Sequence, residues 1–471
     1  QKIVLRKKVC KAKTAKNYLT KFEVNAFTVL EEKEEGPRRR PIFEPLINDI
    51  IKLDSVLTAA CRVEYTTKAQ IRKYVWQTTT AIQFDMAAWF DQFPIHPAIR
   101  HYFRLPRSEL ALTVLPMGFR PSCRVAQSVT TLLLAGGNTP TASCVDNVIF
   151  FGDTQEVKRA ALRFKDRANL IGAKIKADGD AEPQEEYAFL GEVYSHTRKT
   201  RRLTEKTQTK ALYAHHVLSN KRVFSTRQLL AIFGLLLYAA NTLRIDVCRF
   251  HYAMRFLSEV AATSLDSSHI LRKDIRQSLT QWSHEAAENT EVPVFEPEDA
   301  SPSYTIFTDA SVWGWGAVCM RQTGTPLPVS QQWNAQDLRA WNVASSVAAE
   351  PLAIIKALAF FIPLDTPTSV VIFTDHAPVV YASEKGWGKA FAYSHLCQFL
   401  GVLRRRGITV HLKHIPGEEN PADPLSRGKP PLLPVTHIGG KRVGGKWDEG
   451  IRQGGGWVGS GPTEGRRDFR R

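Results

Sequence analysis

Isolated acidic residues beside short apolar runs are the side chains in this sequence best placed to do chemistry. Asp85 ends the strand-like run at residues 82–84, and Asp146 precedes the apolar run at 148–151. Nucleotidyl transfer on two divalent metal ions needs carboxylates that converge from separate strands, because Mg²⁺ takes hard oxygen ligands. Taken singly, each aspartate is also explained as a turn or helix-cap residue.

Four more acidic residues are spread over the second half of the chain. They are Asp309, Glu350, Asp375 and Asp423. Hydrolysis of a phosphodiester on two metal ions needs such a set, since four carboxylates balance two Mg²⁺ and aim a water at phosphorus. Asp309 and Asp375 follow apolar runs that predict strands, whereas Glu350 lies in a helical run at 348–361. A surface position is the alternative for Glu350, but its apolar neighbours predict a packed helix with one inward acid.

The elements that must position these acids form a multidomain α/β and α+β pattern. A Pro-rich, acidic stretch near residue 300 predicts a boundary between two α/β regions, and the stretch before it is helical and basic. The predicted segments are a mostly surface lead-in at 1–35, an α/β region at 36–204, a helical region with linker at 205–300, a second α/β region at 301–428, and a Gly/Arg-rich, disordered tail at 429–471.

Composition narrows the class of partner. The 471 residues include 63 Lys and Arg against 46 Asp and Glu, a net charge of +17. Such an excess favours a polyanion, nucleic acid before an anionic membrane surface. No apolar run is long enough to cross a bilayer and none resembles a signal peptide, so we expect no membrane partner. The seven scattered cysteines lack a CxxC pair, which predicts a reducing intracellular compartment, cytoplasm or nucleus, without disulfides or structural zinc.

Five segments occur in an order that resembles the reverse transcriptase of long-terminal-repeat and tyrosine-recombinase (DIRS-like) retroelements. They are 38–48, which begins Arg-Arg-Arg-Pro-Ile-Phe; 84–92, Phe-Asp-Met-Ala-Ala-Trp-Phe-Asp-Gln; 115–127, which begins Leu-Pro-Met-Gly-Phe-Arg-Pro-Ser; 144–147, Cys-Val-Asp-Asn; and 189–191, Phe-Leu-Gly. The resemblance implies a right-hand polymerase, with fingers and palm at 36–204 and a thumb and connection at 205–300. It also implies that Asp85 and Asp146 bind the catalytic metals.

The same resemblance implies contacts with substrate. Arg40 would meet the triphosphate of the incoming dNTP, and Phe90 would exclude a 2′ hydroxyl. The loop and helix beneath the nascent base pair would include Met117, Gly118, Arg120 and Gln127, with Gly118 permitting close approach of backbone. The 189–191 turn would position the primer. From the residues alone, a solvated basic loop, a core aromatic and a strand end remain the alternatives for Arg40, Phe90 and 189–191.

The hairpin at 144–147 departs from the family pattern. Cys144 stands where the family has an aromatic residue, and Asn147 stands where it has a second Asp. An amide oxygen can coordinate Mg²⁺ but brings no charge, so two carboxylates would have to hold two metals. Some viral RNA polymerases carry Gly-Asp-Asn at this hairpin. The departure also raises the alternative of a polymerase that no longer catalyses.

The second set of acids resembles the ribonuclease H domain that follows the polymerase in these retroelements. The motifs are Thr-Asp-Ala-Ser at 308–311 and Ala-Asp-Pro-Leu-Ser-Arg at 422–427. The resemblance implies that all four acids bind two ions, Mg²⁺ or Mn²⁺. Many such domains carry a mobile His shortly before the last Asp, but residues 417–420 occupy that stretch and His414 lies too early. We expect slower product release rather than loss of cleavage.

Basic residues in and before the helical region could follow a phosphate backbone. They are Lys199, Arg201, Arg202, Arg222, Arg227, Arg244 and Arg249. A solvated helical face is the alternative. In the tail, Trp447 and Trp457 could stack on single strands, or the tail could be a linker.

Together these features predict an RNA-directed DNA polymerase fused to ribonuclease H. Its partners would be an RNA template, a DNA primer, an RNA/DNA hybrid and dNTPs, with two Mg²⁺ or Mn²⁺ at each site. Two competing hypotheses remain: a polymerase-inactive RNA-binding scaffold of a ribonucleoprotein, and a chain in which only the nuclease is active.

Overall fold

The chain divides into two compact units, Gln1–Glu298 and Asp299–Arg471. The computed structural model describes residues 9–11, 23–33, 36–176, 182–294, 302–322, 324–430, 436–438 and 441–443. Among these residues, no helix is both long and apolar enough to traverse a bilayer. The six cysteines whose side chains are described form no disulfide.

The sheet that carries Asp85 and Asp146 is antiparallel, with strand order β4-β7-β6. Its strands are β4 (Thr80–Asp85), β6 (Thr141–Cys144) and β7 (Asn147–Gly152). Because side chains alternate along a strand, Phe150 packs with Phe164 on one face, whereas Phe151 packs with Ile71 on the other. Burial on both faces explains the uninterrupted apolar run, and the strand predicted at 148–151 is confirmed.

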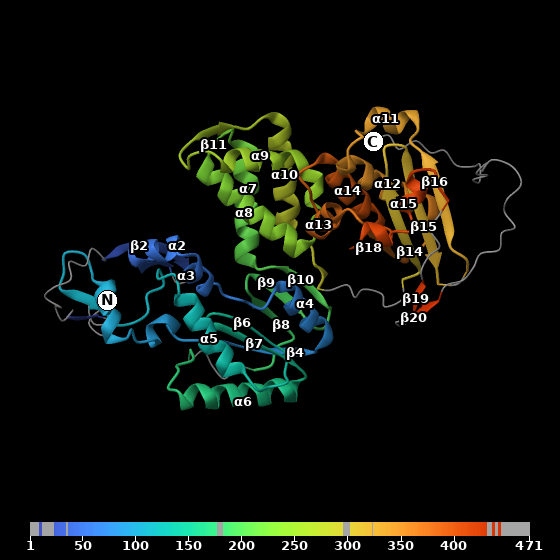
Figure 1. Cartoon of the computed structure of the whole chain (residues 1–471). Coiled ribbons are helices and arrows are strands. Elements are labelled where there is room, and N and C mark those ends of the chain that lie inside the picture. Colours follow the sequence, from blue (N-terminus) through green and yellow to red (C-terminus); the bar gives the residue numbers. More distant parts are fainter. Residues whose placement is uncertain are drawn as a thin grey trace, which may run out of the picture. The chain divides into compact units, whose positions relative to one another are not determined.

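Helices cover both faces of this sheet (Figure 1). They are α4 (Lys68–Gln77), α5 (Ser122–Leu134) and α6 (Thr154–Leu170). Asp153 caps α6 by accepting from the backbone N–H groups of Gln155 and Glu156, and Glu156 accepts in return from the N–H of Asp153. Asp153 therefore leads from β7 directly into α6.

A second sheet, of order β13-β10-β9-β8, leads into the helical region. Its strands are β8 (Glu186–Phe189), β9 (Glu192–Ser195), β10 (Thr200–Leu203) and β13 (Val292–Pro293). The predicted helical stretch is confirmed as α7 (Glu205–Asn220), α8 (Thr226–Leu243), α9 (His251–Ala261) and α10 (Lys273–Glu288), with the short pair β11 (Val223–Ser225) and β12 (Ser268–Ile270) and the turn η3 (Val247–Phe250). Their core centres on Trp282, whose ring stacks on Phe250 at 4.9 Å.

The start of the chain contains more regular structure than its composition indicates. Strands β2 (Val24–Lys33) and β3 (Gly36–Pro45) form a hairpin that crosses the boundary predicted between residues 35 and 36. Arg40 therefore lies on a strand rather than in a loop. Neighbouring elements are β1 (Val9–Lys11), α2 (Ile47–Leu53), α3 (Ser55–Ala60), η1 (Trp89–Gln92), η2 (Pro97–Phe103) and β5 (Leu110–Leu112).

The second unit is built on a mixed five-stranded sheet of order β16-β15-β14-β17-β18. The strands are β14 (Tyr304–Ala310), β15 (Gly314–Arg321), β16 (Leu327–Gln332), β17 (Thr368–Thr374) and β18 (Ile408–His414). Strands β14, β15 and β16 are antiparallel neighbours, whereas β17 is parallel to β14 and to β18. The strands predicted before Asp309 and Asp375 are thereby confirmed.

Helices α12, α13 and α14 lie along one face of this sheet (Figure 1). The helical elements are α11 (Ala335–Ala340), α12 (Ser346–Phe361), α13 (Ala377–Lys385), α14 (Phe391–Arg405), η4 (Gly417–Glu419) and α15 (Asp423–Ser426). In the predicted tail, β19 (Thr436–Ile438) pairs with β20 (Lys441–Val443). Trp447 and Trp457 lie outside the described residues.

Candidate metal centres

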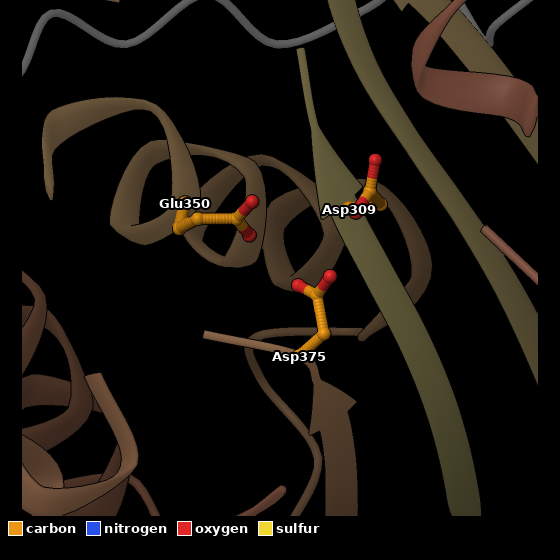
Figure 2. A group of neighbouring side chains, drawn as sticks. All are labelled: Asp309, Glu350 and Asp375. Carbon is orange, nitrogen blue, oxygen red and sulfur yellow. The ribbon is translucent and has the colours of Figure 1, made fainter. Parts of the chain in front are cut away.

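Three acidic side chains of the second unit converge at one end of its sheet (Figure 2). Asp309 lies on β14, Glu350 on α12, and Asp375 directly after β17. One ligand oxygen from each lies within 4.8 Å of the others. Because β14 and β17 are parallel neighbours, their carboxyl ends meet at the same edge. Glu350 reaches this edge from the covering helix, where its Oε1 accepts from the N–H of Ala310 at 3.3 Å.

The fold opposes the charge of two of these carboxylates. Asp309 and Glu350 are each 4% exposed. Burial, with the nearby charges of Asp375 and Asp423, raises the pKa of Asp309 to about 6. Burial, followed by the charges of Asp309 and Asp375, raises the pKa of Glu350 to about 9. Oε2 of Glu350 is buried without a hydrogen-bond partner among the described residues. Buried like charges with an unpartnered oxygen are a donor set that fits a divalent cation.

Asp423, the fourth predicted acid, lies beside this group rather than in it. Its Oδ1 accepts from Arg427 Nη2 at 2.7 Å, one turn further along the chain. The carbonyl oxygens of Leu425 and Ser426 accept from Ser330 and Ser311 at 2.6 Å, which holds α15 against the sheet. A Cβ on Gly316 would lie 2.5 Å from the backbone nitrogen of Ser426, so α15 can approach only a glycine there.

Two histidines border the acidic group differently. His414 ends β18 and is exposed, and no catalytic role was predicted for it. His376, next to Asp375, is half-buried, and its Nε2 lies 2.9 Å from the hydroxyl of Tyr393. Burial lowers the pKa of His376. The sequence shows that His376 adjoins an acid but does not show its contact with a tyrosine on another helix.

The first unit brings Asp85 and Asp146 together at a hairpin. Asp85 ends β4 and pairs with Asn147 of β7, and the N–H of Met86 donates to the carbonyl oxygen of Asp146 at 2.8 Å. Burial, together with the charge of Asp85, raises the pKa of Asp146. Asn147 Nδ2 donates to Asp146 Oδ1 at 3.0 Å. The hairpin tip predicted at Asp146 is confirmed, and Val145 makes its turn with a φ of 58°.

Sequence reasoning missed Lys176, whose ammonium donates to Asp85 Oδ2. The other oxygen, Asp85 Oδ1, is buried without a hydrogen-bond partner in the described part of the chain. The two carboxylates, one of which has an oxygen without a partner, fit a divalent cation. The Lys176 ammonium, however, already contacts the Asp85 carboxylate. The alternation of Lys174, Ile175 and Lys176 indicates a short edge strand. It gives no sign of which carboxylate that strand meets.

Gln127, predicted to contact substrate, is buried and supports the hairpin. Its Nε2 donates to Ser143 Oγ at 2.8 Å, and its Oε1 accepts from the N–H of Val145 at 2.7 Å. Thr130, one turn along α5, donates to the carbonyl oxygen of Val145 at 2.7 Å. Because both polar ends of the Gln127 amide are used inside the protein, its place is beneath the turn that carries Asp146.

The remaining predicted substrate residues lie near β3 and the loop before α5. Arg40 Nη1 lies 3.8 Å from Met117 Sδ, and Met117 and Arg120 are exposed. A Cβ on Gly118 would lie 2.4 Å from the carbonyl oxygen of Phe43, so the backbone of β3 can approach only a glycine there. Asn48 fixes this loop by donating to the carbonyl oxygen of Gly118 at 2.8 Å and accepting from the N–H of Arg120 at 2.9 Å.

Phe90 is partly buried in η1 and packs against the core that contains Phe84 and Trp89. This contact agrees with the core alternative and leaves part of the ring accessible. The segment at 189–191 is the turn between β8 and β9, where Leu190 and Gly191 have φ values of 46° and 81°. A Cβ on Gly191 would lie 2.5 Å from the hydroxyl of Tyr238, which donates to the carbonyl oxygen of Leu190 at 2.8 Å.

A buried ionic network that the sequence analysis did not predict holds that hairpin. The carboxylate of Glu192 is fully buried and accepts from Lys68 at 2.7 Å and from Arg72 at 2.8 Å. The hydroxyls of Tyr194 and Thr242 donate to it at 2.7 and 3.0 Å. Burial alone would raise the pKa of Glu192, but the cations of Arg72 and Lys68 outweigh it and hold the pKa at about 2.

Arg201, predicted on the nucleic-acid surface, is buried inside the first unit. Its guanidinium donates to the carbonyl oxygens of Thr242 and Val294, both at 2.8 Å, and to that of Pro293. With only 4% of its surface exposed, the prediction that Arg201 follows a phosphate backbone is wrong. Its cation joins β10 to the end of α8 and to β13.

Most of the other predicted basic residues also have partners within the first unit. Lys199 donates to the carbonyl oxygens of Val75 and Thr78, Arg202 pairs with Glu186 at 2.9 Å, Arg249 pairs with Glu285 at 2.7 Å, and Arg244 ends α8. Arg222 is exposed just before β11, and Arg227 is exposed in the first turn of α8. Arg227 lies 3.9 Å from the exposed Asp266.

Comparison with known proteins connects the second unit to a family. Residues 299–396 match the RNase H-like domain found in reverse transcriptase. No curated protein matches the chain in sequence. Among solved structures, the foamy viral protease-reverse transcriptase dRH in complex with double-stranded DNA is 15% identical, with a TM-score of 0.49 over 87% of this chain and 68% of that chain. The foamy viral protease-reverse transcriptase in complex with an RNA/DNA hybrid is 14% identical, with a TM-score of 0.47 over 87% and 52%.

Proposed function

We propose that the chain is an RNA-directed DNA polymerase fused to ribonuclease H, and that it serves an intracellular retroelement of the long-terminal-repeat or tyrosine-recombinase type. It would copy an RNA template from a DNA primer with dNTPs and degrade the RNA of the resulting hybrid. The observation that carries the proposal is the convergence of Asp309, Glu350 and Asp375 in a unit that matches the RNase H-like domain of reverse transcriptases.

For hybrid cleavage, Asp309, Glu350 and Asp375 would hold the metal ions, with Asp423 at the rim. Two Mg²⁺ or Mn²⁺ there supply a water activated for attack and a counter-charge for the leaving 3′ oxygen. The protein's part is preorganisation. Ala310 N–H fixes one oxygen of Glu350, Arg427 fixes Asp423, and the convergence of Asp309, Glu350 and Asp375 places their oxygens where a divalent cation would balance their charge.

For polymerisation, Asp85 and Asp146 would hold the metals, which activate the primer 3′ hydroxyl and bind the triphosphate. Gln127 and Thr130 of α5 hydrogen-bond to the backbone of Val145, so α5 fixes the position of the turn that carries Asp146. The surface near Arg40 and Met117 would receive the dNTP, in a fingers region continuous with the palm. The four helices α7 to α10 would be the thumb.

One observation favours a second candidate function, a polymerase-inactive RNA-binding protein. At the hairpin, Asn147 contributes no charge, and Lys176 neutralises one of the two carboxylates. Such a protein would bind RNA without incorporating nucleotides. If the second unit is intact, it would still cleave the RNA of a hybrid.

Primer extension and template cleavage in one tube separate these functions. The assay uses a labelled RNA template, a DNA primer, dNTPs and Mg²⁺ or Mn²⁺. We expect Asp85→Asn to abolish extension and spare cleavage, and Asp309→Asn to do the reverse. Exposed helix and loop acids provide matched controls, Asp166→Asn and Asp365→Asn, which keep both activities. Cleavage without extension by the unaltered chain would support the second candidate, and neither activity would contradict both.

A further inference from the structure

The lysine beside Asp85 is held there by backbone rather than by its flexible side chain. The N–H of Lys176 donates to the carbonyl oxygen of Asp85 at 2.8 Å, and the N–H of Ala87 donates to that of Lys174 at 2.9 Å. Gln92 fastens the same segment, because its Oε1 accepts from the N–H of Lys174 at 2.7 Å and its Nε2 donates to the Lys174 carbonyl oxygen at 3.0 Å. The ammonium of Lys176 therefore starts from a fixed point next to the carboxylate.

The two candidate metal centres differ in the charged groups that they bring together. In the first unit, two carboxylates face one ammonium, and the neighbouring amide of Asn147 donates its N–H to Asp146 instead of offering a third charge. In the second unit, three carboxylates converge with no cation in contact with them in the described part of the chain. Arg427, which lies near this group, pairs with Asp423.

We propose that Lys176 is a built-in counter-ion of Asp85, with which a divalent cation must compete. The centre at Asp85 and Asp146 therefore binds a free divalent cation more weakly than the centre at Asp309, Glu350 and Asp375. Asp85 Oδ1, which has no hydrogen-bond partner among the described residues, is the oxygen of this carboxylate left to bind the cation. The inference rests on the proposed function only in calling the first centre a polymerase site, since metal affinity is measurable without catalysis.

The single charge of Lys176 sets the size of the effect. Moving one positive charge away from direct contact with a carboxylate at a half-exposed site changes the interaction with a cation by roughly 1–2 kcal/mol, or about tenfold in affinity. Asn147→Asp adds a negative charge to the same cluster and acts in the same direction. The two changes should therefore tighten binding additively or better.

Mn²⁺ binding to the full-length chain without nucleic acid tests the proposal, with free Mn²⁺ counted by electron paramagnetic resonance. A Glu350→Gln background removes tight binding at the second centre, so that the first can be titrated alone. On this background we expect Lys176→Met to tighten Mn²⁺ binding about tenfold. Lys176→Arg should leave it unchanged, because a cation remains.

Lys174→Met is the matched control. Lys174 is exposed and lies two residues before Lys176. The variant removes an equal charge that does not contact Asp85, so it should shift the affinity much less. Equal affinities for Lys176→Met and Lys174→Met would overturn the proposal, as would a first centre that binds Mn²⁺ more tightly than the second in the unaltered chain. If Lys176→Met does not fold, Lys176→Gln and the Asn147→Asp variant provide the same comparison.

Primer extension, measured separately, keeps this proposal distinct from the proposed function. Extension by the unaltered chain, combined with no change in Mn²⁺ affinity on removing Lys176, would refute the counter-ion and leave the polymerase. Tighter Mn²⁺ binding in Lys176→Met without extension in any variant would support the counter-ion and refute the polymerase.

Discussion

Buried carboxylates of like charge oppose folding until a cation balances them. Asp309 and Glu350 are both almost fully buried, and burial together with the charges of neighbouring carboxylates raises the pKa of each. Folding therefore makes these groups bind protons more tightly than they do in the unfolded chain. In the absence of metal, stability falls as pH rises from the ordinary carboxyl range towards about 6 for Asp309 and about 9 for Glu350.

A neutral side chain at position 350 should therefore stabilise the metal-free second unit. With a chelator at pH 8, we expect Glu350→Gln to raise its melting temperature by a few degrees, corresponding to at least about 1 kcal/mol. The gain should shrink as pH falls towards the ordinary carboxyl pKa. Calorimetry at several pH values, with and without Mg²⁺, checks this. Saturating Mg²⁺ should reverse the order, and a variant that melts earlier than the unaltered chain in chelator at pH 8 would contradict the argument.

At the scale of elements, the Glu192 network joins three parts of the first unit. Its partners come from α4, β9 and α8, and Arg72 also donates to Asn241 Oδ1 at 2.8 Å. The Lys68 ammonium lies 3.9 Å from the ring centroid of Tyr238, which in turn holds the 189–191 turn. Removing a single charge from such a network leaves its partners buried and unbalanced.

Glu192→Gln should destabilise the first unit by about 3–5 kcal/mol at neutral pH. Because the pKa of Glu192 is held at about 2, its contribution is fully present above the ordinary glutamate pKa and is lost as pH falls towards 2. The difference between variant and unaltered chain should therefore shrink between about pH 4.5 and 2. Denaturant unfolding at several pH values measures it. The exposed Glu186→Gln, which also breaks arginine contacts, should change stability by no more than about 1 kcal/mol.

The elements that sequence predicts well are those whose burial leaves a pattern. Strand β7 reads clearly because both of its faces are buried, and α12 because its apolar neighbours surround one acid. The β2–β3 hairpin is mostly exposed, so nothing in its composition distinguished it from a charged lead-in. The burial of a cationic side chain is harder still to predict. The buried Arg201 and the exposed Arg227 cannot be told apart in the sequence until their contacts are known.

Contacts between distant residues set the limit for the candidate sites. The convergence of Asp309 with Asp375 follows from strand ends, which sequence can indicate. The pairing of Lys176 with Asp85 joins positions 91 residues apart through an edge strand with no distinctive pattern. The hydrogen bonds of Gln127 beneath the hairpin likewise depend on packing of α5 that the sequence does not encode locally.

At the scale of the whole molecule, each compact unit has its own candidate metal centre, and the chain carries a net charge of +17. Several basic residues of the helical region form hydrogen bonds or ion pairs within the protein. The net charge therefore overstates the number of basic side chains that are available to bind phosphates. Arg222 and Arg227 are exposed, whereas Arg201 and Arg249 serve the fold. We therefore expect the exposed basic residues, Arg222 and Arg227 among them, to contribute to nucleic-acid affinity and the internally paired ones not to.

Salt dependence of binding tests that subset. With cleavage and extension silenced by Asp85→Asn and Asp309→Asn, we expect affinity for an RNA/DNA hybrid to fall steeply with salt, because bound cations release counter-ions from phosphates. Arg222→Gln and Arg227→Gln should each lower the magnitude of the log–log slope by up to about one. Arg249→Gln, which removes an internally paired charge, should leave the slope unchanged. Fluorescence anisotropy between low and moderate salt gives the slopes, and equal slopes for all three variants would mean that the helical region lies away from the phosphate backbone.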